Sequence, residues 1–392
     1  MNNNFSAKEP ALGYFYQLRY GLYLLLSSRQ HEDVKILIES LDDIELQIAN
    51  KMELLQTKYH LKSKTNLSDR SSDFWKTIRV WSEEIISGLI DIDNTIFSLV
   101  TTESISTKSF IMDIKNKTDI GKVLSELRKI AKETTNSKNL QGYQAFLGLS
   151  DINQKKLIEK IYIIDASLDF DEIDKKIKNE LKLSALNKHI EPMLDRLEGW
   201  FFKQCIYHLQ EKKDSISFNE LQMQINYISD SFSQENLPID FPDKIIPTDK
   251  DYTDVSIMRF YKQLDLIHIS PRLRENAISN YYRAFGQRSK WLREELLNPQ
   301  EEIDYDKKLV DDWEQKFDLL LDKTDGQSDE KKIEDGKKFY IKFHIDQTPQ
   351  IFIRDRFRED YLTRGSYHML ANNLKVGWHP NYEILKKVDD DT

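Results

Sequence analysis

The segment VKILIESLDDIELQIANKMELLQTKYH, at residues 34–60, determines how the N-terminal part of the chain is expected to fold. Its apolar runs and alternations predict three short strands: Val34–Glu39, Ile44–Ile48 and Met52–Lys58. Side chains along a strand point alternately to its two faces, so Gln56 and Lys58 share one face. Asp43 opens the middle strand and can reach the same point. Such a convergence of an acid, an amide and a lysine is the arrangement that a metal-dependent phosphodiesterase needs.

The order acid, turn, strand and then Gln-x-Lys resembles the core of the PD-(D/E)XK nucleases, in the form where Gln replaces the second acid. Four phrases look like effector nucleases of bacterial anti-phage systems: GYFYQ at 13–17, IESLDD at 38–43, LLQTKYH at 54–60 and DFWKTIRVW at 73–81. They are similar to the CBASS-associated nucleases and, more closely, to the nuclease-bearing effector subunits of Lamassu, or ABC-three-component, systems. The resemblance is strongest over residues 10–100.

The resemblance implies a Mg²⁺-dependent endodeoxyribonuclease, with Mn²⁺ as the alternative ion and Asp43, Gln56 and Lys58 as catalytic residues. Asp43 and the carbonyl oxygen of Gln56 would hold the metal, since oxygen ligands suit these ions. Glu45 and Glu39 are the candidate additional carboxylates. The pattern leaves open whether Asp43 or Glu45 is the principal ligand, and whether one or two ions bind. Lys58 would orient the attacking water or offset developing negative charge.

The segment from the third strand to Ser68 is basic and contains no acid after residue 53. His60, Lys62 and Lys64 are therefore expected to contact double-stranded DNA, because a basic loop beside a metal site lies where a phosphate backbone would pass. The alternative interpretation is a solvated charged loop.

A first helix is expected over residues 8–27. In it, Gln17 lies one turn from both Gly13 and Gly21. Small neighbours would let the helix approach the sheet and aim Gln17 at the site. An incidental glutamine in a tightly packed helix is the other interpretation.

The fold predicted for residues 1–235 is α/β: a PD-(D/E)XK restriction-endonuclease-like domain with a helical extension and helices on both faces of the sheet. Beyond the first three strands, its expected elements are a helix at 73–89, a strand at 95–101, a helix at 120–133 and a strand at 161–166. The helical extension buries Cys205, the single cysteine, as a small core residue. Residues 235–253 contain Pro238, Pro242 and Pro247, which interrupt regular structure and suggest a linker or a domain-crossing segment.

Residues 250–392 are predicted to form a mostly α-helical domain for partner binding or oligomerisation. One of its helices would have a basic flank or be a plain solvated helix, with the cations Arg283, Arg288, Lys290 and Arg293. Residues 322–336 are interpreted as a charged loop. A small terminal hairpin is expected from Phe339–Ile345 and Gln350–Ile353.

Composition limits the classes of function. The 392-residue chain has 39% hydrophobic and 31% charged residues and a net charge of −9, so any affinity for DNA must be local. No secretory signal is visible, and the most apolar run is too short to span a bilayer. The single cysteine fits a reducing compartment. We therefore expect a cytoplasmic protein that does not act in a membrane.

The phrase GWHP at 377–380 resembles the ends of several ABC-three-component proteins, where it belongs to a domain thought to hold the effector on its partners. The resemblance implies a DNA endonuclease of anti-phage or anti-plasmid defence. An SMC-like ABC ATPase subunit and a small accessory subunit would keep it inactive, and release with self-association into a homo-oligomer would activate it. Trp378 is interpreted as an interface anchor, with packing on the preceding helix as the alternative. The second function considered is a non-catalytic interaction subunit that retains the nuclease fold.

Overall fold

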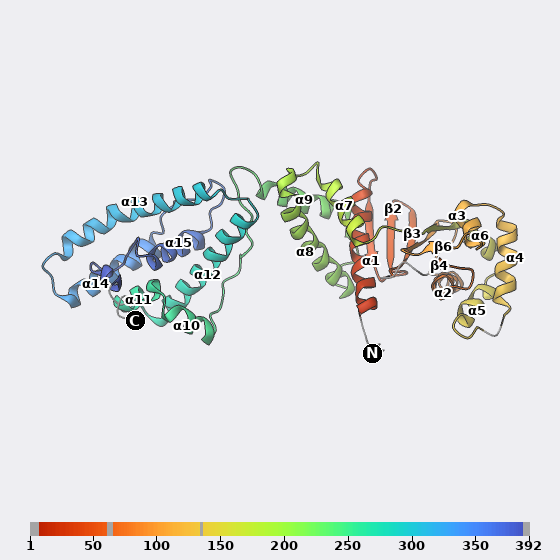
Figure 1. The fold of residues 1–392 in the computed structure, drawn as a ribbon, viewed down its shortest axis with the longest axis horizontal. Helices are drawn as coiled ribbons and strands as arrows, with labels where there is room; N and C mark the ends of the chain where they lie inside the picture. Colours follow the sequence, from red (N-terminus) through yellow and green to blue (C-terminus); the bar gives the residue numbers. More distant parts are fainter. Residues whose placement is uncertain (1–7, 61–65, 134–135, 387–392) are drawn as a thin grey trace. The chain divides into compact units, whose positions relative to one another are not determined.

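The strands predicted at residues 34–58 are neighbours in a six-stranded sheet in the computed structural model of the chain (Figure 1). The order across the sheet is β7-β5-β3-β2-β1-β8. Strands β3, β5 and β7 are parallel, whereas β3, β2, β1 and β8 are antiparallel neighbours, so the sheet is mixed. Its strands are β1 Val34–Ile38, β2 Ile44–Ile48, β3 Lys51–Lys58, β5 Thr95–Thr101, β7 Ile161–Ile164 and β8 Ile216–Ser217; a second pair consists of β4 Asn66–Leu67 and β6 Ser104–Ile105.

The structure describes residues 8–60, 66–133 and 136–386. The chain divides into two units, residues 1–227 (unit 1) and residues 228–392 (unit 2). Within the described ranges, no helix is long and apolar enough to cross a membrane.

Helices cover both faces of the sheet of unit 1, as Figure 1 shows for α1 and α2. Helix α1 lies close to the first face: a Cβ atom added at Gly21 would be 3.2 Å from Cδ1 of Ile36. On the second face, the rings of Trp81 in α2 and Phe97 in β5 are 5.2 Å apart. The helices of this unit are α1 Lys8–Ser27, α2 Ser72–Ser87, α3 Ile111–Asn116, α4 Ile120–Ala131, α5 Leu140–Gly148, α6 Asp151–Lys160, α7 Phe170–Leu181, η1 Asn187–His189 and α8 Ile190–Leu209.

The helix predicted at 73–89 ends earlier than expected. Gly88 caps α2 in the left-handed conformation, with φ of 78°. Leu89, the last residue of the predicted helix, follows the cap and is 64% exposed. The assignment of Cys205 to the core agrees with the structure, because Cys205 is buried and its burial raises the pKa of the thiol to about 12.

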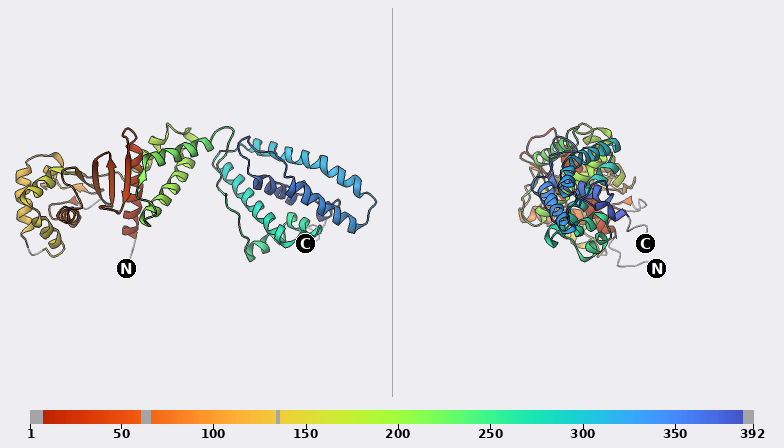
Figure 2. Two further views of the ribbon diagram at one scale, coloured as in Figure 1. Left: turned by 180° about the vertical axis from the view of Figure 1, so that it is seen from behind. Right: turned by 90° about the vertical axis from the view of Figure 1, so that its left-hand side faces the viewer.

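Unit 2 consists of helices and irregular segments, and its long helices α12, α13 and α15 are seen from behind in Figure 2. Helix α9, Phe218–Ser231, runs across the division between the units. The helices of unit 2 are α10 Asp249–Ser256, α11 Arg259–Leu266, α12 Pro271–Arg293, α13 Pro299–Thr324, α14 Asp329–Phe339, η2 Tyr340–Asp346, α15 Asp360–Asn372 and η3 Tyr382–Lys386.

The predicted terminal hairpin is wrong. Helix α14 continues directly into η2, a π-helical segment, and residues 350–353 have no regular structure. Tyr340, Phe343 and His344 are all buried, and their spacing of three and four residues is helical. Burying all three against one core therefore requires a helix, because a strand would place neighbouring side chains on opposite faces.

The predicted charged loop at 322–336 is also helical over most of its length, in the end of α13 and in α14. Its charges pair along and between these helices: Lys331 lies 3.6 Å from Asp335, and Lys323 of α13 lies 2.9 Å from the same carboxylate. Such pairs stabilise helices that have little apolar surface.

The proline-rich segment around residues 235–248 is irregular, as predicted, but it packs along unit 2 rather than acting as a linker. Leu237 is buried in the core of that unit. Arg283 donates to the main-chain carbonyls of Phe241 and Pro242, at 2.9 and 2.7 Å. Two of the residues predicted to form a basic flank on α12 are therefore not on the surface, since Arg283 is buried here and Arg288 is buried against acids of α13.

Trp378 is a core residue and not an exposed interface anchor. Its side chain is fully buried, and its ring lies 5.1 Å from the rings of both Tyr340 and His344. The residues from Phe339 onward therefore complete the core of unit 2 and do not form a separate module.

Candidate active site

The register of the sheet places Asp43 against Gln56. Strands β2 and β3 are antiparallel, and Ile44 of β2 pairs with Leu55 of β3. Asp43, just before Ile44, is therefore opposite Gln56, just after Leu55. Gln56 and Lys58 are two residues apart on β3 and share one face. The three residues predicted to be catalytic therefore meet at one edge of the sheet.

Short contacts connect this cluster. Asp43 Oδ1 lies 3.1 Å from Gln56 Nε2, and Lys58 Nζ donates to Gln56 Oε1 at 2.6 Å and lies 3.7 Å from Asp43 Oδ2. Thr57 holds the carboxylate in place, since its main-chain N and its Oγ1 donate to Asp43 Oδ2 at 2.7 and 3.0 Å. The side chains of Lys58 and Asp43 are 21% and 20% exposed. The ion pair is therefore partly buried, and a partly buried ion pair is weak evidence for a role in stability.

Asp42 supports the cluster from behind. Its carboxylate accepts hydrogen bonds from Trp81 Nε1 at 2.5 Å, from the main-chain N of Asp43 at 2.9 Å, and from Gln56 Nε2. Burial raises the pKa of Asp42 to about 7, against the effect of the hydrogen bonds from Trp81 and Gln56. The sequence analysis did not single out Asp42, although two adjacent acids before a strand are a signal that one points inward and the other outward.

Gln17 and Glu39 reach the same place. Gln17 of α1 is buried and donates to the main-chain carbonyl of Asp43, which also accepts from the main-chain N of Glu39 at 3.1 Å. Burial raises the pKa of Glu39, as does the charge of Asp43, whereas Gln17 and Lys58 act to lower it. Of the two glycines flanking Gln17, only Gly21 is required by a close approach to the sheet, because a Cβ at Gly13 would meet nothing within 4 Å.

Glu45 lies on the same face of the sheet as Asp43, two residues further along the chain. It is buried, and its carboxylate accepts a hydrogen bond from Gln47 Nε2 at 2.6 Å along the same strand. Its partner across the ladder is Leu54. The structure thus brings Asp43, rather than Glu45, against Gln56.

The predicted DNA-binding residues are placed only in part. His60 lies just beyond the end of β3, with Nε2 2.8 Å from Asp73 Oδ2 and its side chain 34% exposed. Lys62 and Lys64 lie outside the described residues, so their predicted role in the basic segment stays a prediction.

The donor set at this edge fits a hard divalent cation. Asp43 offers a carboxylate, Gln56 an amide oxygen, and Glu39 a second carboxylate in electrostatic range of Asp43. Oxygen ligands that are partly open to water match the preference of Mg²⁺, which keeps several water ligands. In this structure Gln56 turns its oxygen to Lys58 Nζ and its NH2 group to Asp43, so it would offer that oxygen to an ion at Asp43 once the amide turns over.

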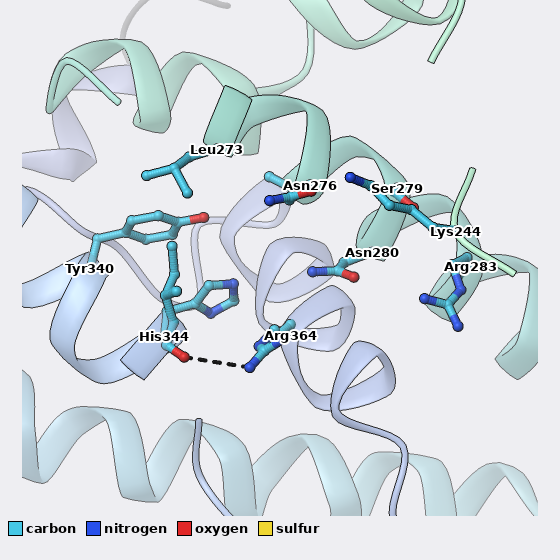
Figure 3. A pocket seen from close by; sticks show the side chains of 11 residues that line it. Lys244, Leu273, Asn276, Ser279, Asn280, Arg283, Tyr340, His344 and Arg364 are labelled. Atoms are coloured by element: carbon cyan, nitrogen blue, oxygen red, sulfur yellow. Dashed lines mark hydrogen bonds between the residues drawn. The ribbon is translucent and has the colours of Figure 1, made fainter. Parts of the chain in front are cut away.

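Unit 2 contains a different cavity, of about 270 Å³, lined by residues of α12, η2 and α15 (Figure 3). Lys244, Arg283 and Arg364 line it, and none of its described lining residues is an acid. Arg364 donates to Thr348 Oγ1 at 2.8 Å and to the carbonyl of Ile345 at 3.4 Å, the bond dashed in Figure 3. This cavity suits an anionic group and offers no carboxylate to a metal, so it does not compete with the sheet edge for metal-dependent chemistry.

Residues 260–386 match a known family, the C-terminal domain 7 of the ABC-three component (ABC-3C) systems. Unit 2 is thus similar, over most of its length, to an ABC-3C C-terminal domain. This match supports a component of an ABC-3C defence system, and it includes the GWHP phrase at 377–380.

Two solved structures show limited similarity to the chain. One is a SAVED/CARF-domain containing Cap4 receptor of Moraxella osloensis, at 16% identity and a TM-score of 0.36, covering 70% of this chain and 68% of that one. The other is the Cap4 receptor of Acinetobacter baumannii with the cyclic trinucleotide 3'3'3'-cAAA, at 15% identity and a TM-score of 0.32, covering 70% and 69%. These scores are too low to assign a fold or a function to the chain. No curated protein matches the sequence.

Proposed function

We propose that this ABC-3C component is a metal-dependent DNA endonuclease effector, with a nuclease domain of the PD-(D/E)XK type in unit 1. The observation that carries the proposal is the meeting of Asp43, Gln56 and Lys58 at one partly open sheet edge. A mixed sheet with helices on both faces, in which the acid opens one strand and Gln-x-Lys closes the next, supports this fold.

Each residue of the cluster has a role in the proposed reaction. A bound Mg²⁺ or Mn²⁺ ion supplies Lewis-acid charge for a phosphodiester and lowers the pKa of a coordinated water. Asp43 and the amide oxygen of Gln56 would hold it, with Glu39 as the nearby second carboxylate. Lys58 orients the attacking water or offsets negative charge on the phosphate. Thr57 keeps the Asp43 carboxylate in one orientation through its two hydrogen bonds.

Unit 2 is proposed as the part that binds partner subunits. The ABC-3C match to residues 260–386 supports this role. The proposed partners are an SMC-like ABC ATPase subunit and a small accessory subunit, which hold the nuclease inactive until it is released and self-associates. Such control is needed because a nuclease without strict sequence preference would cleave the DNA of its own host.

Cleavage of plasmid DNA with Mg²⁺ tests the proposal, with and without the partner subunits. Lys58→Ala and Asp43→Asn should abolish cleavage. Lys51→Ala is the matched control, because Lys51 is exposed at the opposite end of the same strand. Lys51→Ala should cleave as the wild type does. If both site variants retain full cleavage, the active-site assignment is wrong, and if the wild type never cleaves, the chain is a non-catalytic interaction subunit.

A further inference from the structure

Three potential metal ligands from three elements meet beyond the ends of the parallel strands β3 and β5. His60 follows β3, Glu103 follows β5, and Asp73 lies in the first turn of α2. The strand ends are held together here, because the main-chain N of Thr102 donates to the carbonyl of Lys58 at 3.2 Å and the main-chain N of His60 donates to Thr102 Oγ1 at 2.9 Å. The backbone therefore fixes two of the three positions against each other.

The ligand atoms of this group are close enough to share one ion. One nitrogen of His60 and one oxygen each of Asp73 and Glu103 all lie within 4.8 Å of one another, and the His60–Asp73 distance is 2.8 Å. Two ligands bound at about 2.1 Å to one cation can be up to about 4.2 Å apart, so small side-chain rotations would complete the coordination.

The buried carboxylate of Glu103 points to a ligand. Glu103 is only 5% exposed, and its hydrogen bonds run through the main chain: its N donates to Thr101 Oγ1 at 3.1 Å, and its carbonyl accepts from Ala166 N at 2.7 Å. Within the described ranges its carboxylate has no hydrogen-bond or ion-pair partner. A carboxylate so little exposed to water, with an imidazole nitrogen and a second carboxylate within 4.8 Å, favours a bound cation at this position.

We propose that His60, Asp73 and Glu103 bind a divalent transition-metal ion, Zn²⁺ or Mn²⁺, in preference to Mg²⁺. An imidazole nitrogen with two carboxylates suits these ions, whereas Mg²⁺ favours oxygen ligands alone. Three protein ligands leave an open position for water. This site has no residue in common with the Asp43–Gln56–Lys58 cluster and does not depend on the proposed nuclease function. The ion ties the end of β3 to α2 and to the end of β5.

Binding of Mn²⁺ alone to the full-length, chelator-treated protein tests the inference by electron paramagnetic resonance. Pulsed spectra of bound Mn²⁺ should show coupling to an imidazole ¹⁴N nucleus. His60→Asn should remove this coupling, and both His60→Asn and Glu103→Gln should weaken Mn²⁺ or Zn²⁺ binding at this site at least about tenfold, because a direct ligand is lost.

Two controls locate the bound ion. His31→Asn changes an exposed histidine of the same unit and should leave the ¹⁴N coupling intact. Asp43→Asn should also leave it intact, even if cleavage is lost, which separates this site from the proposed nuclease centre. Should Glu103→Gln fail to fold, Asp73→Asn provides the second ligand variant. The inference is overturned if no ¹⁴N coupling is seen, if it persists in His60→Asn, or if Asp43→Asn alone abolishes it.

Discussion

At the scale of single residues, the adjacent acids have different expected roles: Asp42 stabilises the fold, and Asp43 takes part in the proposed reaction. Asp42 is buried and accepts from Trp81 and Gln56, whereas a fifth of the Asp43 side chain is exposed. We expect Asp42→Ala to lower the free energy of unfolding by about 2–4 kcal/mol, because two buried donors would lose their acceptor. Asp43→Asn should cost about 1 kcal/mol while abolishing cleavage. Chemical denaturation measures both, and equal losses would contradict the supporting role of Asp42.

A buried histidine pair gives unit 2 a pH dependence. His344 Nε2 lies 3.1 Å from His368 Nε2, and burial lowers the pKa of both rings, that of His368 to about 3. The charges of His368 and Arg364 further lower the pKa of His344. Both rings stay neutral in the folded state and take up protons on unfolding. Their contribution to stability is therefore complete above pH 6.5, the ordinary value, and is lost as the pH falls toward about 3.

Replacing both histidines by glutamine should remove this dependence. We expect the slope of unfolding free energy against pH, between pH 6 and pH 4, to fall by up to about 1.4 kcal/mol per pH unit for each ring. Carboxylates that titrate in the same range are present in both proteins and cancel in the comparison. Denaturant titrations at several pH values measure the slope. Identical slopes in variant and wild type would show that the rings are already protonated in the folded protein.

The sequence predicted the meeting of Asp43, Gln56 and Lys58 because alternation within a strand fixes which side chains share a face. It could not choose between Asp43 and Glu45, since that choice depends on the register between β2 and β3. It also missed Thr57, whose contribution comes partly through its main-chain N. Hydrogen bonds from main-chain donors do not depend on side-chain type, so a sequence pattern does not predict them.

At the scale of elements, helices α12 and α15 pack closely through Gly365. A Cβ atom added there would overlap the carbonyl of Asn280 and Cβ of Ala284. We expect Gly365→Ala to destabilise unit 2 by about 1–3 kcal/mol, through forced separation of the helices. Gly199→Ala in α8 is the matched control, because nothing lies within 4 Å of its added Cβ, and it should stabilise by about 0.5–1 kcal/mol. Thermal denaturation compares them; a stabilised Gly365→Ala would show that the helices can separate without cost.

Element prediction succeeded where a pattern had one interpretation. The strands at 44–48 and 95–101 are found with the predicted bounds, since β-branched and apolar residues fill both. The segment after residue 339 was misread because its aromatic and apolar residues are dense enough to fit either alternation or a helical stripe. The burial of Tyr340 and His344 on one side of a continuous helix resolved it, and that burial depends on Trp378, far along the sequence.

At the scale of the whole molecule, the sequence predicted a break in regular structure near the three prolines. It did not show whether this segment packs with unit 2 or only links two domains. Proline reports only that helices and ladders stop. Side chains distant in sequence attach the segment to unit 2. Gln287, fully buried in α12, accepts a hydrogen bond from the main-chain N of Asp240 at 2.8 Å, and Arg354 donates to the carbonyl of Asn236 at 2.8 Å. The segment at 235–248 is therefore a structural part of unit 2.

Two fragments of the chain test whether the segment at 235–248 is a structural part of unit 2. The fragment 228–392 keeps the whole of unit 2, whereas 250–392, the boundary expected from the sequence, removes the segment that satisfies Arg283 and Gln287. We expect 228–392 to unfold cooperatively and 250–392 to be less stable by at least about 3 kcal/mol, because both side chains are buried and would lose their partners. If the two fragments are equally stable, the segment is a linker and not a structural part of unit 2.

We expect a fragment to co-purify with the proposed ATPase subunit only if its part of unit 2 is folded. The fragment 228–392 should bind that subunit, because it contains the ABC-3C match at 260–386 together with the segment that completes its core. A chain truncated before Phe339 should not bind, since it lacks Tyr340 and Trp378 and unit 2 cannot close around them. Circular dichroism of each fragment separates loss of fold from loss of surface. A folded 228–392 that fails to bind, while the full chain binds, would place the docking surface in unit 1.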